Sequence, residues 1–376
     1  MDSSALVDSD GAAAAEAVTA AQSREAELVG AVLNNPNDIY ALLRLGTFLT
    51  EQNRDRDAAA VYRQLLSDHP NNGLALVKLG SILHEYPAFQ DEAMELLQKA
   101  ISLNASATDA YRPLAWTLDQ LGRRDDAIAV LRAWCAIAPG EPTASHLLAA
   151  YSDEAVPERA ADAFVEKTFD RAAARFDVHL RDALQYRGPE VLSAHLDGLL
   201  PSAARGTLDV LDMGCGTGLC APLLRPWARH LTGVDLSSGM LAKARDAGGY
   251  DALEVVELTA YLNATVQSGG RFDVLFAADT LVYFGRLDGL LAQAFAVLNA
   301  GGWLAFTVER QIATDAGGTP RDLLLDTTGR YKHSEQYIQN ALAAAGFETP
   351  EIIQAQVRLE SGAPEIALVV AARKPG

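Results

Sequence analysis

The sequence predicts an α + α/β protein in which an N-terminal helical solenoid precedes a doubly wound α/β domain. Three observations lead to this prediction. The first half repeats a pattern every 34 to 35 residues, strand and helix patterns alternate after residue 200, and a glycine-rich turn separates the first strand from its helix. A length of 376 residues gives room for two hydrophobic cores.

Composition shifts divide the chain into four parts. We expect a disordered tail over residues 1–20, a repeat domain over 21–150, a helical bridge or lid over 151–200, and the α/β domain over 201–376. The tail is predicted from an acidic, alanine-rich start that offers little apolar surface to bury.

Charge and cysteine usage exclude several kinds of partner. The formal net charge is −18 with a pI near 4.8, so a nucleic acid or an anionic membrane surface would repel the chain. No apolar run reaches the roughly 18 residues that a membrane span needs. Cys135, Cys215 and Cys220 have no metal-ligand spacing and cannot all pair. We therefore expect a cytoplasmic protein with no metal, no nucleic acid and no membrane partner.

The repeats align on small residues. Leu45-Gly46, Leu79-Gly80 and Leu114-Ala115 stand in register, and Ala58, Ala93 and Ala127 follow them at the same intervals. Each unit is predicted to be a pair of amphipathic helices. The pattern resembles the tetratricopeptide repeat, with one residue inserted near "EYPAFQD"; a generic array of helical hairpins is the alternative.

Such solenoids offer a concave surface made by the first helix of each pair. The register places the following residues there: Leu43, Thr47, Val77, Ser81, Arg112 and Trp116. This face is mixed and partly apolar. It is compatible with a protein or peptide partner, with a homodimer, or with a purely structural role.

The bridge carries Phe164, Phe169 and Phe176 at roughly helical spacing, which predicts core positions. Tyr186 and Arg187 stand just before the α/β domain. They are interpreted either as contacts to an anionic substrate or as an ordinary helix end.

Seven β-rich runs follow residue 207. Five alternate with helical stretches, which predicts a parallel sheet, and the last two form a hairpin around "SGAP"; the runs are "LDVLDM", "HLTGVDL", "LEVVEL", "FDVLFAAD", "WLAFTVE", "EIIQAQVRLE" and "EIALVVAARK". A parallel sheet that ends in an antiparallel hairpin is atypical of dinucleotide-binding domains.

The glycine turn indicates the kind of ligand. Gly214, Gly216 and Gly218 follow the first strand, but the third glycine comes one residue too early for the NAD fingerprint. Asp212 adds a carboxylate where a pyrophosphate would be repelled, and Asp235 at the end of the second strand can accept both hydroxyls of a ribose. A ligand with a ribose, a positive centre and no phosphate fits best, which describes S-adenosylmethionine.

The stretch "VLDMGCGTG" resembles the first motif of class I methyltransferases, and the resemblance continues through "GVDLSSGML" and "FDVLFAADTLVYFG". It is closest to bacterial methyltransferases that carry N-terminal tetratricopeptide repeats, and more distant to ubiquinone/menaquinone and biotin-pathway methyltransferases. The resemblance implies a Rossmann-like, seven-stranded methyltransferase domain that uses S-adenosylmethionine.

The resemblance also implies a role for each motif position. The turn, including Cys215, packs on the methionyl part, Asp212 lies near the ammonium, and Asp235 with Leu236 holds the ribose. Met240 lies against the adenine, and Glu257 and Leu258 approach it from the third strand. Two alternatives remain: Asp235 as a helix cap and Met240 as core filler.

Acceptor contacts are expected at the ends of the fourth and fifth strands, from Asp279, Thr280, Tyr283 and Glu309. Asp279 and Tyr283 are catalytic candidates, and Asp279 also borders the cofactor. His333 is the candidate general base, although a helix-start histidine is commoner than a catalytic one.

The sequence thus predicts an S-adenosylmethionine-dependent methyltransferase that acts on a small molecule by O- or C-methylation. The alternatives are a peptide or protein methyltransferase whose repeats recruit the substrate, an inactive interaction scaffold, and an NAD-dependent oxidoreductase.

Overall fold

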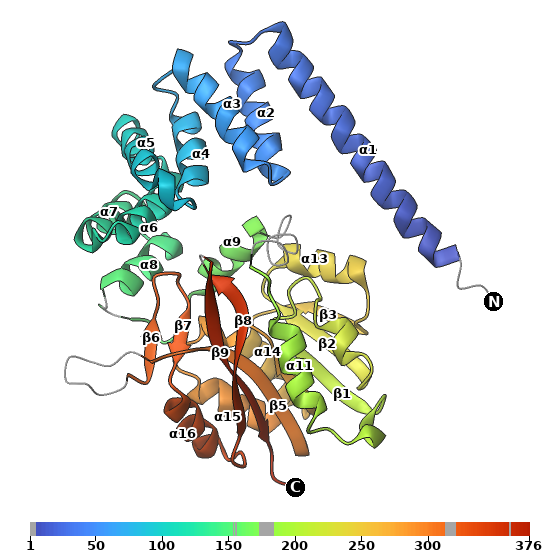
Figure 1. Cartoon of the computed structure of the whole chain (residues 1–376). Helices are drawn as coiled ribbons and strands as arrows, with labels where there is room; N and C mark the ends of the chain where they lie inside the picture. Colours follow the sequence, from blue (N-terminus) through green and yellow to red (C-terminus); the bar gives the residue numbers. More distant parts are fainter. Residues whose placement is uncertain (1–4, 153, 155, 173–183, 313–320, 361) are drawn as a thin grey trace. The chain divides into compact units, whose positions relative to one another are not determined.

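The computed structural model describes residues 5–152, 154, 156–172, 184–312, 321–360 and 362–376. The chain divides into two compact units, Met1–Gly140 and Glu141–Gly376. Each unit has its own core, and each is described by itself below (Figure 1).

Unit 1 is entirely helical. Its helices are α1 (Ala5–Asn34), α2 (Ile39–Glu51), α3 (Asp55–Asp68), α4 (Gly73–Leu83), α5 (Gln90–Leu103), α6 (Tyr111–Gln120) and α7 (Arg124–Ile137). From Ala5 onward the structure has helix where the sequence predicts a disordered tail. Alanine is the best helix former, and it dominates this stretch.

Helices α2/α3, α4/α5 and α6/α7 form the three predicted hairpins. Small residues sit where the paired helices cross: a Cβ on Gly46 would lie 2.6 Å from the Tyr62 ring, and one on Gly80 would lie 2.7 Å from Leu97. The residue inserted in the second repeat is taken up by a 3₁₀ turn, Pro87–Phe89. The repeat spacing therefore reflects close helix packing.

Unit 2 is built on one mixed sheet of nine strands. The strands are β1 (Leu208–Met213), β2 (Ala228–Asp235), β3 (Ala252–Val255), β4 (Phe272–Ala277), β5 (Leu298–Arg310), β6 (Leu323–Leu325), β7 (Tyr331–His333), β8 (Glu351–Glu360) and β9 (Ala363–Arg373). Strands β1 to β5 are parallel in the order β3-β2-β1-β4-β5, and β9 joins β5 antiparallel with β8 outside it.

Seven of these strands are the predicted ones. The β6/β7 hairpin is additional and pairs with the end of β5 through Glu309 and Arg310. Its strands are three residues each, too short to show an alternating pattern in the sequence.

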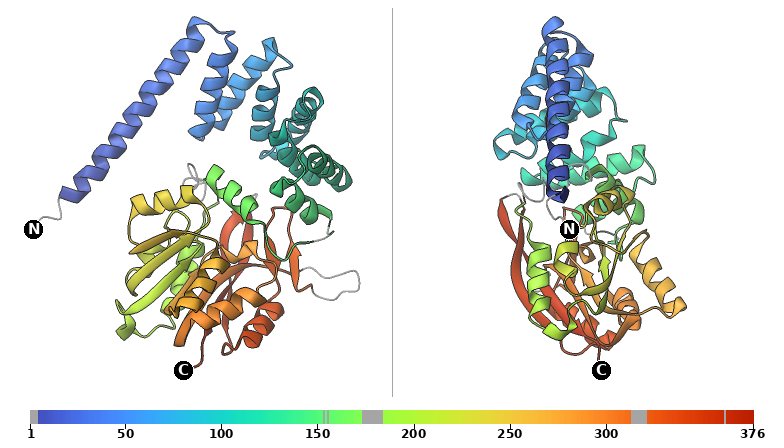
Figure 2. Two further views of the ribbon diagram at one scale, coloured as in Figure 1. Left: turned by 180° about the vertical axis from the view of Figure 1, so that it is seen from behind. Right: turned by 90° about the vertical axis from the view of Figure 1, so that its right-hand side faces the viewer.

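Helices cover both faces of the sheet (Figure 2). The helices of unit 2 are α8 (Pro142–Ser152), α9 (Asp162–Ala172), α11 (Gly188–Asp197), α12 (Ala221–Leu224), α13 (Ser238–Ala247), α14 (Leu258–Ser268), α15 (Asp288–Val297) and α16 (Glu335–Ala345). Of these, α11 and α12 pack on one face of the sheet and α14 to α16 on the other. The sheet of unit 2 has a hydrophobic cluster on each face, and alternate residues of β4 contribute to each. Leu275 and Ala277 pack in the cluster with α14 to α16, and Val274 and Phe276 pack in the cluster with α11 and α12.

Helix α8 belongs to unit 2. Its His146 is 4% exposed, and Nε2 lies 2.9 Å from the carbonyl oxygen of Gly329. The His146 ring lies 4.3 Å from the Phe164 ring and 6.0 Å from the Tyr331 ring, between centroids. The helix that precedes the bridge therefore anchors the loop between β6 and β7.

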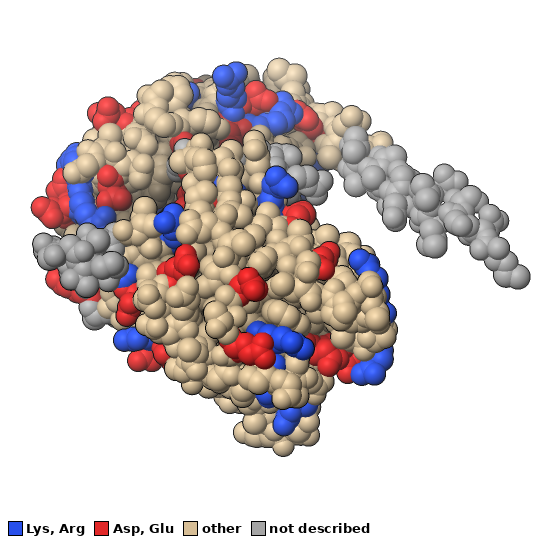
Figure 3. All heavy atoms as spheres, turned by 60° about the horizontal axis from the view of Figure 1, so that its bottom comes forward, with Lys and Arg blue, Asp and Glu red and all other residues tan. Residues whose placement is uncertain are grey.

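On the face shown in Figure 3, acidic and basic side chains are interspersed, and much of that surface is neither. Among the described residues, no helix combines the length and apolar character that crossing a bilayer requires.

Candidate active site

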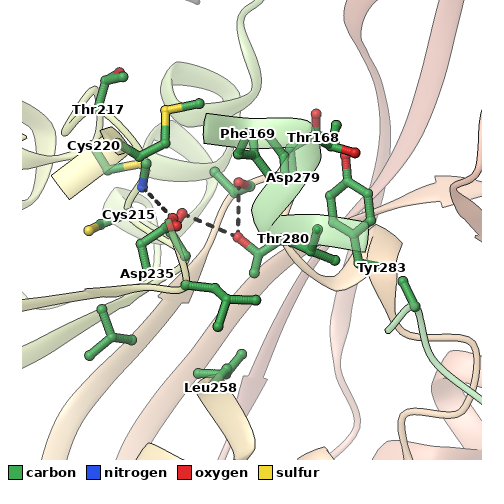
Figure 4. A pocket seen from close by; sticks show the side chains of 18 of the residues that line it. Thr168, Phe169, Cys215, Thr217, Cys220, Asp235, Leu258, Asp279, Thr280 and Tyr283 are labelled. Atoms are coloured by element: carbon green, nitrogen blue, oxygen red, sulfur yellow. Dashed lines mark hydrogen bonds between the residues drawn. The ribbon is translucent and has the colours of Figure 1, made fainter. Parts of the chain in front are cut away.

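A cavity of about 300 Å³ opens at the carboxyl ends of the parallel strands. Residues that follow β1, β2, β3 and β4 line it, which is where open α/β sheets bind ligands. Helix α9 contributes Thr168 and Phe169 (Figure 4). The end of α9 is attached to the start of α13, since Asp170 Oδ1 accepts hydrogen bonds from Ser237 Oγ at 2.5 Å and Gly239 N at 3.3 Å.

The three glycines of the turn have different roles. All have positive φ, at 76°, 54° and 93° for Gly214, Gly216 and Gly218. A Cβ on Gly214 would lie 2.4 Å from Thr280 Oγ1, so this glycine makes room for a neighbouring side chain. A Cβ on Gly216 would meet no atom within 4 Å, and Gly216 lines the cavity. Only there does the missing side chain leave space that a ligand can fill.

Asp235 ends β2 beside that space. Its carboxylate accepts hydrogen bonds from Gly216 N at 2.9 Å and from Ser237 N at 2.8 Å. Burial raises the pKa of Asp235, and these backbone donors oppose the shift. Ser237, not Asp235, caps α13 by accepting from Met240 N. Since a carboxylate has about four acceptor positions, capacity for ligand hydroxyls remains.

Glu257 begins α14 beyond the end of β3. It accepts a hydrogen bond from Ala260 N at 2.8 Å, and Arg159 Nη1 lies 3.5 Å away. Burial alone would raise the pKa of Glu257, but hydrogen bonds and the Arg159 charge hold it below the ordinary value.

Most predicted site residues line the cavity. These are Gly214, Cys215, Gly216, Asp235, Leu236, Met240, Glu257, Leu258, Asp279, Tyr283 and Tyr186. Figure 4 shows Asp235 and Tyr283 toward opposite ends of the labelled set, with Thr280 between them. Met240 is fully buried while also lining the cavity, so both readings of it are compatible with the structure.

Asp212 lies behind the glycine turn, not in the cavity. It is 0% exposed, and its Oδ2 accepts a hydrogen bond from Tyr250 Oη at 2.5 Å. Burial raises the pKa of Asp212 to about 7. Gly218 likewise does not line the cavity, because Tyr250 and Ala244 lie against its position. The hydrogen bond between Tyr250 and Asp212 therefore lies behind the turn, away from the cavity.

His333 does not face the cavity, in contrast to the predicted general base. It ends β7, is 0% exposed, and its Nε2 lies 2.9 Å from the carbonyl oxygen of Gly285. Its ring stacks on Tyr337, and burial lowers its pKa to about 4. The helix begins only after Ser334, so the ring belongs to a strand inside the core.

Glu309 and Arg187 also lie outside the cavity lining. Glu309 is 2% exposed and forms an ion pair with Arg358. The side chain of Arg187 is exposed, and its backbone N–H donates to the carbonyl oxygen of Val357. Of the bridge aromatics, Phe164 is buried in the core, Phe169 lines the cavity, and Phe176 lies outside the described residues.

Sequence reasoning missed three arginines that line the cavity: Arg159, Arg330 and Arg358. Arg358 is 1% exposed, and its Nη1 lies 3.2 Å from both carboxylate oxygens of Asp279. The one available signal was an arginine inside an apolar strand. The face of the sheet on which the Arg358 side chain lies depends on a register shift between Gln356 and Arg358, and simple alternation along the strand does not predict that shift.

Comparison with known proteins identifies the parts of the chain. A profile described as a methyltransferase domain matches residues 161–352, just over half of the chain. Two tetratricopeptide-repeat profiles match residues 40–72 and 91–151.

Among curated relatives, the malonyl-[acyl-carrier protein] O-methyltransferase of Enterobacter lignolyticus is 32% identical over 143 residues, which cover 38% of this chain and 52% of that protein. The trans-aconitate 2-methyltransferase of Paracidovorax citrulli is 38% identical over 99 residues, covering 26% and 36%. The chain spans about half the length of the curated relatives it matches, or less. A solved structure, the 1,6-didemethyltoxoflavin-N1-methyltransferase of Burkholderia thailandensis, has 23% identity and a TM-score of 0.41, covering 56% of this chain and 87% of that one.

Proposed function

The chain belongs to the methyltransferase domain family, and we propose that it transfers a methyl group from S-adenosylmethionine to a small-molecule acceptor. The observation that carries the proposal is the pairing of Gly216 with Asp235. An open glycine position faces the cavity, and the Asp235 carboxylate lines the cavity beside it, able to accept hydrogen bonds from a ribose. The Asp235 carboxylate beside the turn disfavours a ligand that places phosphates there.

The residues present fit this cofactor. Gly216 leaves the space that a Cβ would fill, Asp235 retains acceptor positions, and Leu236, Met240 and Leu258 offer apolar surface for an adenine. Glu257 at the start of α14 is an acceptor for the adenine amine. Asp212 supports the turn and reaches the cofactor only indirectly.

When bound, S-adenosylmethionine supplies a methyl group already activated on a sulfonium. The chain's own residues then need to align the acceptor and exclude water. Thr168 and Phe169 of α9 and Tyr283 after β4 line the cavity, and the Phe169 and Tyr283 rings meet edge to face at 5.5 Å. We propose that these side chains help to exclude water once the cofactor and the acceptor are bound.

A small acceptor is favoured by the size of the cavity, which has to hold both ligands. The two curated relatives described above are named for acceptors that are small acids or carry an acid. We propose that the repeats of unit 1 bind a partner, a substrate carrier or a second copy of the chain. A peptide acceptor brought by the repeats is the alternative.

Calorimetric titration of the full chain tests the proposal. S-adenosylmethionine and S-adenosylhomocysteine are expected to bind with micromolar dissociation constants, and NAD is expected not to bind. Binding of NAD in their place would identify an oxidoreductase. Binding of none of the three would favour a scaffold that has lost catalysis.

A further inference from the structure

Arg330 lines the cavity and contacts carboxylates through only one of its guanidinium nitrogens. Arg330 Nη1 lies 3.1 Å from Glu360 Oε2 and 3.5 Å from Glu309 Oε1. Among the described residues, neither Nη2 nor Nε of Arg330 forms a hydrogen bond or an ion pair, and the guanidinium also interacts electrostatically with the Tyr283 phenol. The side chain is 21% exposed and lines the cavity. Arg330 is therefore anchored by carboxylates on one side and retains donors on the other.

The neighbouring Arg358 has no such free edge. Its Nη1 contacts both oxygens of Asp279, its Nη2 pairs with Glu309, and its Nε donates to Glu360 at 3.0 Å. Arg159 is committed to other partners: its Nη1 pairs with Asp162 at 2.5 Å and lies 3.5 Å from Glu257, and its guanidinium lies over the ring of Phe284. Of the three cavity arginines, Arg330 is thus the one placed to bind an anion near the end of β4.

The described residues at this end of the cavity offer no base that is free to remove a proton. The Asp279 carboxylate is compensated by Arg358 on both oxygens. Burial raises the pKa of Tyr186 well above its ordinary value, so this phenol stays protonated. His333 lies outside the cavity. An acceptor that must lose a proton before methyl transfer would find little help here.

We infer that the acceptor is a small carboxylic acid with an apolar body, bound as its carboxylate by the free edge of Arg330 and converted to a methyl ester. This inference rests on the proposed function. A guanidinium edge matches a carboxylate with two parallel hydrogen bonds. The rings of Phe169 and Tyr283 provide the apolar wall. Compensation of Asp279 by Arg358 removes the repulsion that a bare carboxylate would exert on the acceptor.

The reaction balances without a base. One carboxylate oxygen forms the new bond to the methyl carbon, while the carbon–sulfur bond breaks and its electron pair stays on sulfur. The products are a neutral ester and a neutral thioether, and no proton moves. Arg330 orients the carboxylate through its two oxygens. Arg330 therefore strengthens binding of the acceptor, but its positive charge also lowers the nucleophilicity of the reacting oxygen.

The test measures binding first and turnover second. The full chain is saturated with S-adenosylhomocysteine and titrated with hexanoate, benzoate and cinnamate, with the matched amides and alcohols as controls. Arg330→Met is expected to weaken carboxylate binding by at least about 10-fold, while the affinity for S-adenosylhomocysteine stays within about twofold. Arg330→Lys keeps the charge but not the paired donors, and an intermediate loss is expected. Arg286→Met, an exposed arginine outside the cavity, is the matched control.

Turnover with labelled S-adenosylmethionine should yield a product that releases labelled methanol under mild alkali, as methyl esters do. Failure of every carboxylate to bind the S-adenosylhomocysteine complex overturns the inference, as does equal binding to wild type and both Arg330 variants. Methylation of a phenol, amine or carbon acid in place of a carboxylate also overturns it and leaves the proposed function standing. Absence of cofactor binding defeats the proposed function itself.

Discussion

Arg358 on β8 and Asp279 after β4 form a buried contact in which one nitrogen, Nη1, lies 3.2 Å from both carboxylate oxygens. Asp279 has a φ of +59°, a conformation that side chains other than glycine seldom adopt. Its N–H donates to Thr307 Oγ1 at 2.8 Å. The ion pair and this hydrogen bond hold an unfavourable backbone conformation at the mouth of the cavity.

Replacing Arg358 should destabilise unit 2 strongly. Arg358→Met leaves the carboxylates of Asp279, Glu309 and Glu360 facing one another with less compensation, and the loss expected for breaking a buried pair is about 3–5 kcal/mol. Urea unfolding measures it. Adding Glu309→Gln should restore part of the stability, because it removes one of the unpaired charges. A loss under about 1 kcal/mol would contradict the assignment of Arg358 as the central brace.

Asp235→Ala should weaken binding of S-adenosylhomocysteine by roughly 100-fold, the value expected for losing two hydrogen bonds to a charged group. Asp235→Asn keeps one acceptor oxygen and should lie between the two. Calorimetry gives the affinities, and a melting curve checks the fold, because Gly216 and Ser237 also lose their acceptor. Asp246→Asn, on the exposed side of α13, is the control. Unchanged affinity in Asp235→Ala would contradict the proposal that Asp235 binds the ribose.

The two glycines at the start of the turn should respond differently to alanine. Gly216→Ala meets no atom within 4 Å, so we expect a folded protein that loses about 1–2 kcal/mol from its positive φ. Its cofactor affinity should fall further, since the new methyl group occupies the cavity. Gly214→Ala would collide with Thr280 and should lose more stability. Melting curves with and without S-adenosylhomocysteine separate these effects; normal cofactor binding by Gly216→Ala would argue against a ligand at this glycine.

His333 should affect stability at low pH and leave the pH profile of turnover unchanged. Its pKa falls from 6.5 to about 4 on folding because the ring is buried. Between these values the unfolded chain binds a proton that the folded chain does not. The free energy of unfolding therefore drops as the pH falls from about 6.5 to 4, by at most on the order of 3 kcal/mol for this ring.

His333→Gln removes this titration, so its unfolding free energy should depend less on pH in that window than that of wild type. Denaturation at pH 5 and 7.5 tests this, with His69→Gln, outside unit 2, as control. A change in the pH profile of kcat/KM above pH 6 in His333→Gln would instead restore His333 as a general base.

The strands and the glycine turn could be predicted because they leave local patterns. Each of the first four parallel strands is a β-rich run followed by its own helix, and the turn has a fixed spacing. The predicted residues that line the cavity, such as Asp235 and Glu257, stand directly at strand ends, where position in the sequence implies position in space.

The acceptor end of the cavity could not be predicted in the same way. Arg358 meets Asp279 from 79 positions away, and Arg330 lies in a short hairpin with no periodic signal. The helix predicted to begin at His333 begins after it: Ser334 caps α16, and His333 completes β7. In each case a long-range contact, absent from local patterns, decides where the side chain points.

The effect of an N-terminal truncation should depend on whether α8, which packs in unit 2, is kept. A chain of residues 141–376 keeps α8 and is expected to fold and to bind S-adenosylhomocysteine as the full chain does. A chain of residues 153–376 loses the contact of His146 with Gly329 and uncovers Phe164 and Tyr331. We expect a loss of several kcal/mol, typical of removing buried side chains. Equal melting temperatures of the two fragments would show that α8 is dispensable.

The tetratricopeptide-repeat profile extends to residue 151, yet α8 packs within the unit that carries the methyltransferase profile. Helix α8 thus has the sequence pattern of a tetratricopeptide repeat but packs in the core of the unit that carries the methyltransferase profile. An exchange of repeat arrays between related proteins that cuts at the end of the repeat pattern would give unit 2 a foreign α8 beside the loop between β6 and β7. A junction near Gly140 keeps α8 with the unit in which it packs, so recombination at that point would exchange the two units without disturbing either core.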